Sequence, residues 1–298
     1  MKINGVEIED TFAEAFGMRA ARILITADSL HWAREASISM TGFATSVIAC
    51  GCEAGIEREL DPSETPDGRP GLSVLLFTMS SKDMQKQVQD RVGQCVLTCP
   101  GTACFSGMEA EETVKMGAQL RYFGDGFQVS KLIGGRRYWR IPVMDGEFLC
   151  EATAGMVRAV GGGNFLILGT SRPAVLAAAE RAVAAMRALP NVVLPFPGGI
   201  VRSGSKVGSK YKGLIASTND AYAPTLKAQT GTALTPDIEA VLEIVIDGVN
   251  EADVRAATKA GIAAACEVGA EGGIRRISAG NYGGKLGPFH FHLREIMA

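Results

Sequence analysis

The sequence predicts an α+β protein of two duplicated ferredoxin-like α/β sandwich lobes, each a mainly antiparallel sheet flanked by helices. Three observations support this prediction. Short β-rich runs alternate with amphipathic segments, the same order of segments occurs twice, and capping residues precede the helices in both halves. Each half has the order β-α-β, loop, β-α-β, which is the split-βαβ pattern. The predicted lobes are residues 1–149 and 150–298.

The first half begins with a β-rich run, after which Ser29 can cap an amphipathic segment. A later serine-capped segment shows helical spacing of Met84, Val88 and Val92. The predicted strands are 21–28, 45–51, 72–79 and 94–98, and the predicted helices are 30–40 and 80–93.

The second half repeats this order. Ser171 and Pro173 open an alanine-rich helix, and Asn250 caps the next one. The predicted strands are 163–170, 191–196, 241–248 and 273–280, and the predicted helices are 173–189 and 251–269. Between the halves, residues 119–149 alternate apolar and polar positions around glycine turns. This pattern predicts a meander of hairpins that extends the first lobe or packs against a partner chain.

Composition and charge restrict the class of protein. The 298 residues are 47% hydrophobic, which suffices for a full core. A net charge of -2 argues against general affinity for nucleic acid or anionic membranes. Seven cysteines without a secretion signal indicate reduced thiols, and no apolar run approaches the ~20 residues of a membrane span. We therefore expect a cytoplasmic protein with no nucleic-acid and no membrane partner.

The stretch FPGGIVRSGSKVGSKYKG, residues 196–213, is rich in glycine, serine and basic residues. Gly199 and Gly204 have the spacing of a Walker A loop, but Ser205 stands where that motif requires lysine. We therefore expect no nucleoside triphosphate site. The stretch is either a solvated connection or a cradle in which backbone N–H groups bind carboxylates or phosphate. The cations of such a cradle would be Arg202, Lys206, Lys210 and Lys212.

Thiols and histidines do not predict a nucleophilic or metal centre. Cys95, Cys99 and Cys104 cluster in the sequence, but no base lies near them. His290 and His292 share one face of a strand without a carboxylate at a matching spacing. We expect structural thiols and no metal.

Glu243 is the carboxylate that stands out, because it lies among apolar neighbours in the β-rich run 241–248. Aligning the two halves on their capped helices places Ser73 at the matching position, so the fold itself requires no acid there. Desolvation in an apolar strand raises the pKa of a carboxyl group, which suits proton transfer near neutral pH. The alternative is an edge-strand glutamate that points to water.

Ordered segments along the whole chain resemble one family. They are INGVEIEDTFAEAF (3–16), SETPDGRPG (63–71), DRVGQCVLT (90–98), PFPGGIV (195–201), SKVGSK (205–210), STNDAY (217–222), EIVIDG (243–248) and ISAGNYGGKLG (277–287). These long segments resemble the formylmethanofuran:tetrahydromethanopterin formyltransferases. The resemblance implies two α/β lobes, in agreement with the predicted duplication. It also implies a homo-oligomer, dimer or tetramer, with the active site near a subunit interface.

The resemblance implies transfer of a formyl group between the amine of methanofuran and nitrogen-5 of tetrahydromethanopterin or its dephospho form. Both coenzymes act as substrates and have anionic tails, and no tightly bound cofactor is expected. Direct attack through a tetrahedral intermediate requires orientation, oxyanion donors and one proton shuttle.

Glu243 matches the acidic residue of the family's EIVI motif and is the expected shuttle. Candidates for oxyanion or tail contacts are Asn219, Lys206 and backbone amides of the glycine-rich stretch. The expected substrate-binding residues are Asp67, Arg69, Arg202, Ser205, Lys206, Lys210, Asn219, Asp220, Asn281 and Lys285.

The near-neutral charge and Arg202 depart from the archaeal pattern and resemble the methylotrophic bacterial members. For these, the resemblance implies association with hydrolase subunits that convert formyl-methanofuran to formate, with the pterin as formyl donor. A second hypothesis is a coenzyme-binding scaffold subunit of that complex with little catalysis of its own. Retention of Glu243 in its motif favours the enzyme.

Overall fold

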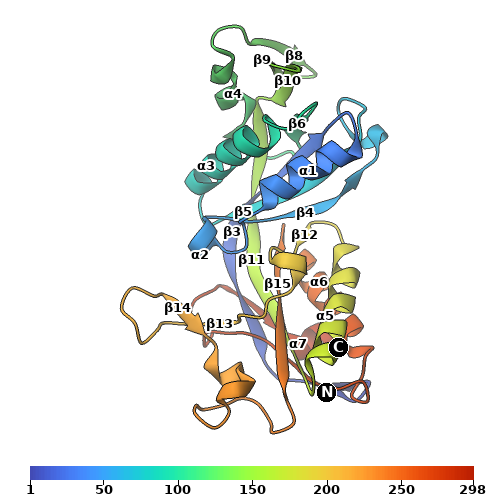
Figure 1. The fold of residues 1–298 in the computed structure, drawn as a ribbon, viewed down its shortest axis with the longest axis vertical. Coiled ribbons are helices and arrows are strands. Elements are labelled where there is room, and N and C mark those ends of the chain that lie inside the picture. The colour runs from blue at the N-terminus through green and yellow to red at the C-terminus, as the bar shows by residue number, and fades with distance from the viewer. The chain divides into compact units, whose positions relative to one another are not determined.

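The computed structural model describes residues 1–298, which form two compact units. Unit 1 comprises Met1–Gly17 and Val160–Ala298, and unit 2 comprises Met18–Ala159. Two long strands, β3 (Phe12–Thr26) and β11 (Thr153–Gly169), each contribute residues to both units (Figure 1). No helix is long and apolar enough to cross a membrane.

Unit 1 contains the duplicated motif in the order β11, α5, β12, β15, α6, β16, and its strands pair in the spatial order β16–β11–β15–β12. Both helices begin at predicted caps, because Ser171 and Asn250 accept from the backbone N–H groups three residues on. The bounds are α5 (Arg172–Arg187), β12 (Val192–Val193), β15 (Ala240–Gly248), α6 (Glu251–Cys266) and β16 (Ile274–Ser278).

The first residues of the chain belong to unit 1, whereas the predicted boundary at 149/150 assigned them to the N-terminal lobe. The physical reason is strand pairing, since residues 1–17 pair with strands near the C-terminus. β2 is parallel to β16, and the start of β3 is antiparallel to β17. The bounds are β1 (Lys2–Ile3), β2 (Val6–Ile8), β17 (Phe289–His292) and α7 (Leu293–Met297).

Unit 2 repeats the motif with the spatial strand order β4–β5–β3–β6, and β10, β9 and β8 extend the sheet beyond β6. The predicted duplication and α+β class are therefore confirmed. The bounds are α1 (Leu30–Thr41), β4 (Glu53–Leu60), β5 (Gly71–Thr78), α3 (Ser81–Arg91), β6 (Ala103–Ser106), β7 (Glu112–Lys115), α4 (Gly117–Leu120), β8 (Val129–Ile133), β9 (Arg136–Val143) and β10 (Gly146–Glu151).

Two predicted strands of unit 2 are wrong. Residues 45–51 contain the short helix α2 (Val47–Cys50), which Ser46 caps and Gly51 ends at φ 75°. The predicted strand 94–98 is instead the end of a helix, because a π-helical turn (Val92–Val96) continues α3 and residues 97–98 form a turn. Val88, Val92 and Val96 recur every four residues and are all buried, as on one face of a helix. A short apolar run does not by itself distinguish a strand from a helix.

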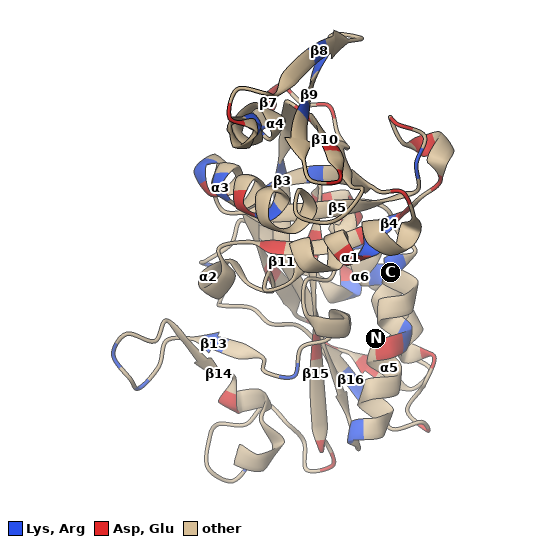
Figure 2. Ribbon diagram, turned by 45° about the horizontal axis from the view of Figure 1, so that its top comes forward, with Lys and Arg blue, Asp and Glu red and all other residues tan.

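The connection between β12 and β15 lies on the sheet face of unit 1 opposite α5 and α6. Its Leu234 and Ile238 pack against Leu166 and Leu168 of β11. The connection also forms a hairpin, β13–β14, whose loop bears basic residues (Figure 2). The bounds are η4 (Pro197–Gly199), β13 (Ser205–Val207), β14 (Ala216–Thr218), η5 (Asp220–Tyr222) and η6 (Pro224–Leu226).

Candidate active site

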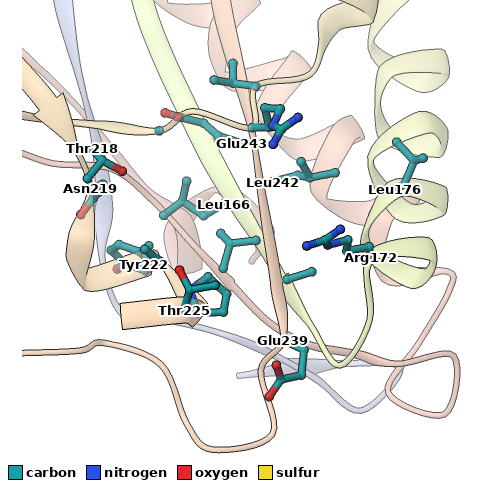
Figure 3. A pocket seen from close by; sticks show the side chains of 17 residues that line it. Leu166, Arg172, Leu176, Thr218, Asn219, Tyr222, Thr225, Glu239, Leu242 and Glu243 are labelled. Carbon is teal, nitrogen blue, oxygen red and sulfur yellow. The ribbon is translucent and has the colours of Figure 1, made fainter. Parts of the chain in front are cut away.

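Glu243 lies on β15, directly opposite Leu166 of β11, and Leu166 is directly opposite Ser278 of β16. Residues directly opposite each other in an antiparallel sheet point to the same face. Ile244 belongs to the core beneath α5 and α6, so Glu243 points to the other face. That face is covered by residues 201–239 of the connection between β12 and β15, called here the 201–239 connection. Figure 3 shows Glu243 on β15 near Leu166.

The Glu243 carboxyl group has no hydrogen bond or ion pair within the chain. Burial alone raises its pKa to about 7. Gly204 lies directly against it, since a Cβ at Gly204 would lie 3.2 Å from Glu243 Oε2. The half-buried carboxyl is thus neither neutralised nor held by another side chain, and it titrates where proton transfer near neutral pH requires.

A cavity of about 500 Å³ opens beside Glu243 on both sides of β15 (Figure 3). Arg202 and Gly204 line it from the glycine-rich stretch, and Arg172 lines it from the start of α5. Neither guanidinium group makes a hydrogen bond or ion pair within the chain. The other polar residues that line the cavity are Thr218, Asn219, Tyr222, Thr225 and Glu239.

The structure separates the predicted cradle into cavity and hairpin residues. Arg202 and Asn219 line the cavity, and Ser205 pairs with Thr218 in the hairpin. Lys206 Nζ lies 2.5 Å from Asp220 Oδ1, and this hydrogen bond lowers the pKa of Asp220. Lys206 is therefore already neutralised within the chain.

Lys210 lies in the exposed loop of the hairpin, whereas Asp67 and Arg69 belong to unit 2. The Arg69 guanidinium group donates to Asp67 Oδ2 and Asp28 Oδ1, both at 2.9 Å, and to the Gly101 carbonyl at 2.6 Å. Asp67 and Arg69 thus bond one another and Thr26 of β3, and Arg69 also bonds Asp28 and Gly101.

A buried carboxylate that the sequence did not predict shapes the 281–287 loop. Glu14, 0% exposed, accepts hydrogen bonds from the backbone N–H groups of Tyr282, Gly284, Leu286 and Gly287. Burial raises the pKa of Glu14, but these four bonds outweigh burial and leave it lowered. The predicted Asn281 donates to Thr11 Oγ1 at 3.1 Å, and Lys285 is exposed.

The sequence also did not predict Arg172, Tyr222 and Tyr282 as site residues. Tyr222 lines the cavity, and its hydroxyl lies 3.2 Å from Ser278 Oγ. Arg172 occupies the first turn of α5, directly after the predicted cap Ser171. That cap was the one available signal, because it placed a cation at the start of a helix beside the sheet.

In unit 2, Ser73 stands at the position that matches Glu243, and its side chain already has a hydrogen-bond partner. Ser73 Oγ donates to Glu57 Oε2 at 2.6 Å, and Arg22 donates to both Glu57 oxygens at 2.7 and 2.8 Å. The buried carboxylate of unit 2 is thus paired with a guanidinium group, whereas Glu243 in unit 1 is not. This contrast supports a chemical role for Glu243 and a structural role for Glu57.

All seven cysteines are free thiols, and no group of three or more potential metal ligands lies together. Cys104 Sγ and Cys150 Sγ are buried 3.6 Å apart. The His290 and His292 rings lie 4.8 and 5.1 Å from the Phe12 ring.

Comparison with known proteins matches both parts of the chain to one family. A profile described as formylmethanofuran-tetrahydromethanopterin formyltransferase matches residues 1–143, and a profile of the proximal lobe of that family matches residues 146–296. The chain is 69% identical over 298 residues to the formylmethanofuran–tetrahydromethanopterin formyltransferase of Methylococcus capsulatus, with 100% of both chains covered. It is 56% identical to one subunit of the formyltransferase/hydrolase complex of Methylorubrum extorquens, covering 99% of this chain and 97% of that one.

Two solved structures have the same fold. The formyltransferase/hydrolase complex of Methylorubrum extorquens, solved with methylofuran, contains a chain with a TM-score of 0.98, 55% identity, and coverage of 100% of this chain and 99% of that one. The Methanosarcina barkeri formyltransferase gives a TM-score of 0.93 at 50% identity, covering 99% of this chain and 100% of that one. The chain belongs to the formylmethanofuran–tetrahydromethanopterin formyltransferase family.

Proposed function

We propose that this chain transfers a formyl group between nitrogen-5 of a tetrahydromethanopterin and the amine of a methanofuran. The observation that carries the proposal is the unpartnered Glu243 carboxyl beside a cavity lined by two unpaired guanidinium groups. Full-length relatives named for this reaction support it.

The transfer proceeds by direct attack. The acceptor nitrogen bonds to the formyl carbon, and the formyl oxygen becomes an oxyanion. Glu243 takes the proton from the attacking nitrogen and delivers it to the donor nitrogen, which leaves as the carbon–oxygen double bond re-forms. One proton passes through Glu243, and no covalent enzyme intermediate is needed. Both coenzymes act as substrates, and no tightly bound cofactor enters the mechanism.

The cations around the cavity bind the anionic tails of the coenzymes. Arg172 and Arg202 are available for this because neither is paired within the chain. Further contacts with the coenzymes are proposed from three other places. They are Lys210 on the hairpin, Asn281 and Lys285 on the 281–287 loop, and Asp67 and Arg69 of unit 2.

We also propose that the chain forms homo-oligomers and associates with hydrolase subunits. The Methylorubrum extorquens relative is itself named as a subunit of a formyltransferase/hydrolase complex, which supports this association.

An assay of the isolated chain with both full-length coenzymes tests the proposed function. Formyl transfer, followed by the absorbance of the formylated pterin, is the expected result. Binding of both coenzymes without transfer would favour the scaffold hypothesis and overturn the enzyme.

Arg172→Ala and Arg202→Ala are each expected to raise KM about tenfold or more for at least one coenzyme, with kcat nearly unchanged. Tail binding is shared by ground state and transition state, so it affects KM rather than kcat. The effect should shrink with added salt, because exposed charges are screened within about 8 Å at physiological ionic strength. Steady-state kinetics at low and high salt measure it.

Arg187→Ala is the matched control, since Arg187 lies at the opposite end of α5 and is exposed. Wild-type KM values for both coenzymes in Arg172→Ala and Arg202→Ala at low salt would remove these residues from tail binding.

A further inference from the structure

Tyr282 lies on the loop that follows β16, next to the row of the sheet that contains Glu243. Gly280 is fixed to β11, because its N–H donates to Asn164 Oδ1 at 2.6 Å and its carbonyl accepts from Asn164 Nδ2 at 3.1 Å. Asn164 is directly opposite Val245, two residues along β15 from Glu243 and on the same face. The chain therefore leaves the sheet beside Asn164 of β11, across β11 from β15 and one same-face position along from Glu243, and Tyr282 is two residues further on.

The backbone at Tyr282 is held firmly. Its N–H donates to Glu14 Oε2 at 2.7 Å, and Gly284 N–H donates to the same oxygen at 2.9 Å. The Tyr282 ring packs on Phe16, with 6.4 Å between ring centroids. A side chain fixed by its backbone on one side and its ring on the other is preorganised, as a group that stabilises a transition state must be.

The Tyr282 hydroxyl has no hydrogen-bond partner within the chain. Burial, then the charges of Glu243 and Glu14, raise the pKa of Tyr282. The phenol thus stays protonated at neutral pH and lies close enough to Glu243 to sense its charge. Tyr282 thus supplies an unpaired O–H donor on the loop after β16, within range of the charge of the unpaired Glu243 carboxyl group.

Of the other donors near Glu243, Arg202 is unpaired but is assigned to the anionic tails of the coenzymes. Lys206 is paired with Asp220, and Glu14 accepts from four backbone N–H groups of the 281–287 loop. Glu243 itself transfers a proton from the attacking nitrogen to the leaving nitrogen, so it is a carboxylate when attack begins. The developing oxyanion therefore needs a donor other than Glu243.

We propose that Tyr282 is a second catalytic residue, whose phenolic O–H donates a hydrogen bond to the formyl oxygen as it becomes an oxyanion. This role rests on the proposed formyl transfer. Glu243 moves the proton between the two nitrogens, and Tyr282 stabilises the charge on oxygen without transferring its own proton. Glu14 is then a positioning residue that acts through the loop.

Tyr282→Phe tests this role, because it removes the hydroxyl and keeps the ring against Phe16. The expected result is a fall in kcat of about 10²–10³-fold, the usual loss for one oxyanion donor, with both KM values within about twofold of wild type. Tyr138→Phe is the matched control, since Tyr138 is also half-buried but belongs to unit 2. It should keep wild-type kcat.

A second measurement separates catalysis from structure. Replacing Tyr282 with 3-fluorotyrosine and 3,5-difluorotyrosine alters the acidity of the phenol and hardly changes its shape. If the hydroxyl donates to the oxyanion, kcat changes progressively with phenol acidity, whereas a purely structural tyrosine gives the same kcat throughout.

An active wild type with an unchanged Tyr282→Phe variant would overturn the role of Tyr282 and leave the proposed function standing. Asn219→Ala, which removes the amide that lines the cavity, would then be expected to lower kcat instead. A wild type that binds both coenzymes but transfers no formyl group would overturn both proposals.

Discussion

Glu243→Gln is expected to lower kcat by about two to four orders of magnitude, the usual contribution of general acid–base catalysis. Glutamine keeps the size and shape of the side chain, but it cannot take a proton from the attacking amine. The Glu243 carboxyl makes no hydrogen bond or ion pair within the chain, so the fold loses no contact by this change. Steady-state kinetics should show KM values close to those of wild type. The exposed Glu267 supplies the control, as Glu267→Gln should retain wild-type kcat.

The pH dependence of kcat/KM gives an independent check. Burial raises the pKa of Glu243 to about 7. Because the carboxylate form must receive the first proton, kcat/KM should rise with pH through about 7 and then level off. This rise should be absent in Glu243→Gln. A variant with near-wild-type kcat, or one that keeps the same rise, would exclude Glu243 as the shuttle.

The sequence predicted the duplicated motif because its signals are local. Ser29, Ser171 and Asn250 each cap a helix within the next three residues, and the apolar spacing behind them is regular. The wrong strand at 45–51 shows the limit of such signals. The apolar residues of this segment suit a strand, but Ser46 and Gly51 begin and end a helix of four residues there.

The candidate site was predicted only where the local sequence reveals a residue's environment. Glu243 was recognisable because a carboxylate stood alone in an apolar strand. Arg172 gave no such signal, since its role depends on a cavity that forms only when α5, β15 and the connection before β15 come together. Tyr282 gave none either, since its place depends on the contacts of its loop with Glu14 and Phe16. Lys206 is a different case. The sequence predicted it as a free cation of the cradle, because the sequence does not show that Asp220 neutralises its charge.

Glu14→Gln is expected to destabilise unit 1 and to lower kcat as well. Glu14 is separated by 268 or more residues from the loop whose four backbone N–H groups it accepts, so only the folded chain reveals this contact. A glutamine side chain offers one accepting oxygen and an NH₂ group that faces two of these donors. Two N–H groups are then unsatisfied at about 1–3 kcal/mol each, so we expect the free energy of unfolding to fall by about 2–6 kcal/mol. Denaturant unfolding measures this loss.

Two further results separate this role of Glu14 from a general effect of mutation. The pKa of Glu14 is lowered in the fold, so its stabilising contribution is present above its unfolded pKa near 4.5 and is lost as pH falls through the folded value. That part of the acid dependence should disappear in Glu14→Gln. Glu7→Gln, at an exposed position of β2, should change the free energy of unfolding by less than about 0.5 kcal/mol. A Glu14→Gln variant as stable as Glu7→Gln, with wild-type kcat, would show that the 281–287 loop keeps Tyr282 in place without this carboxylate.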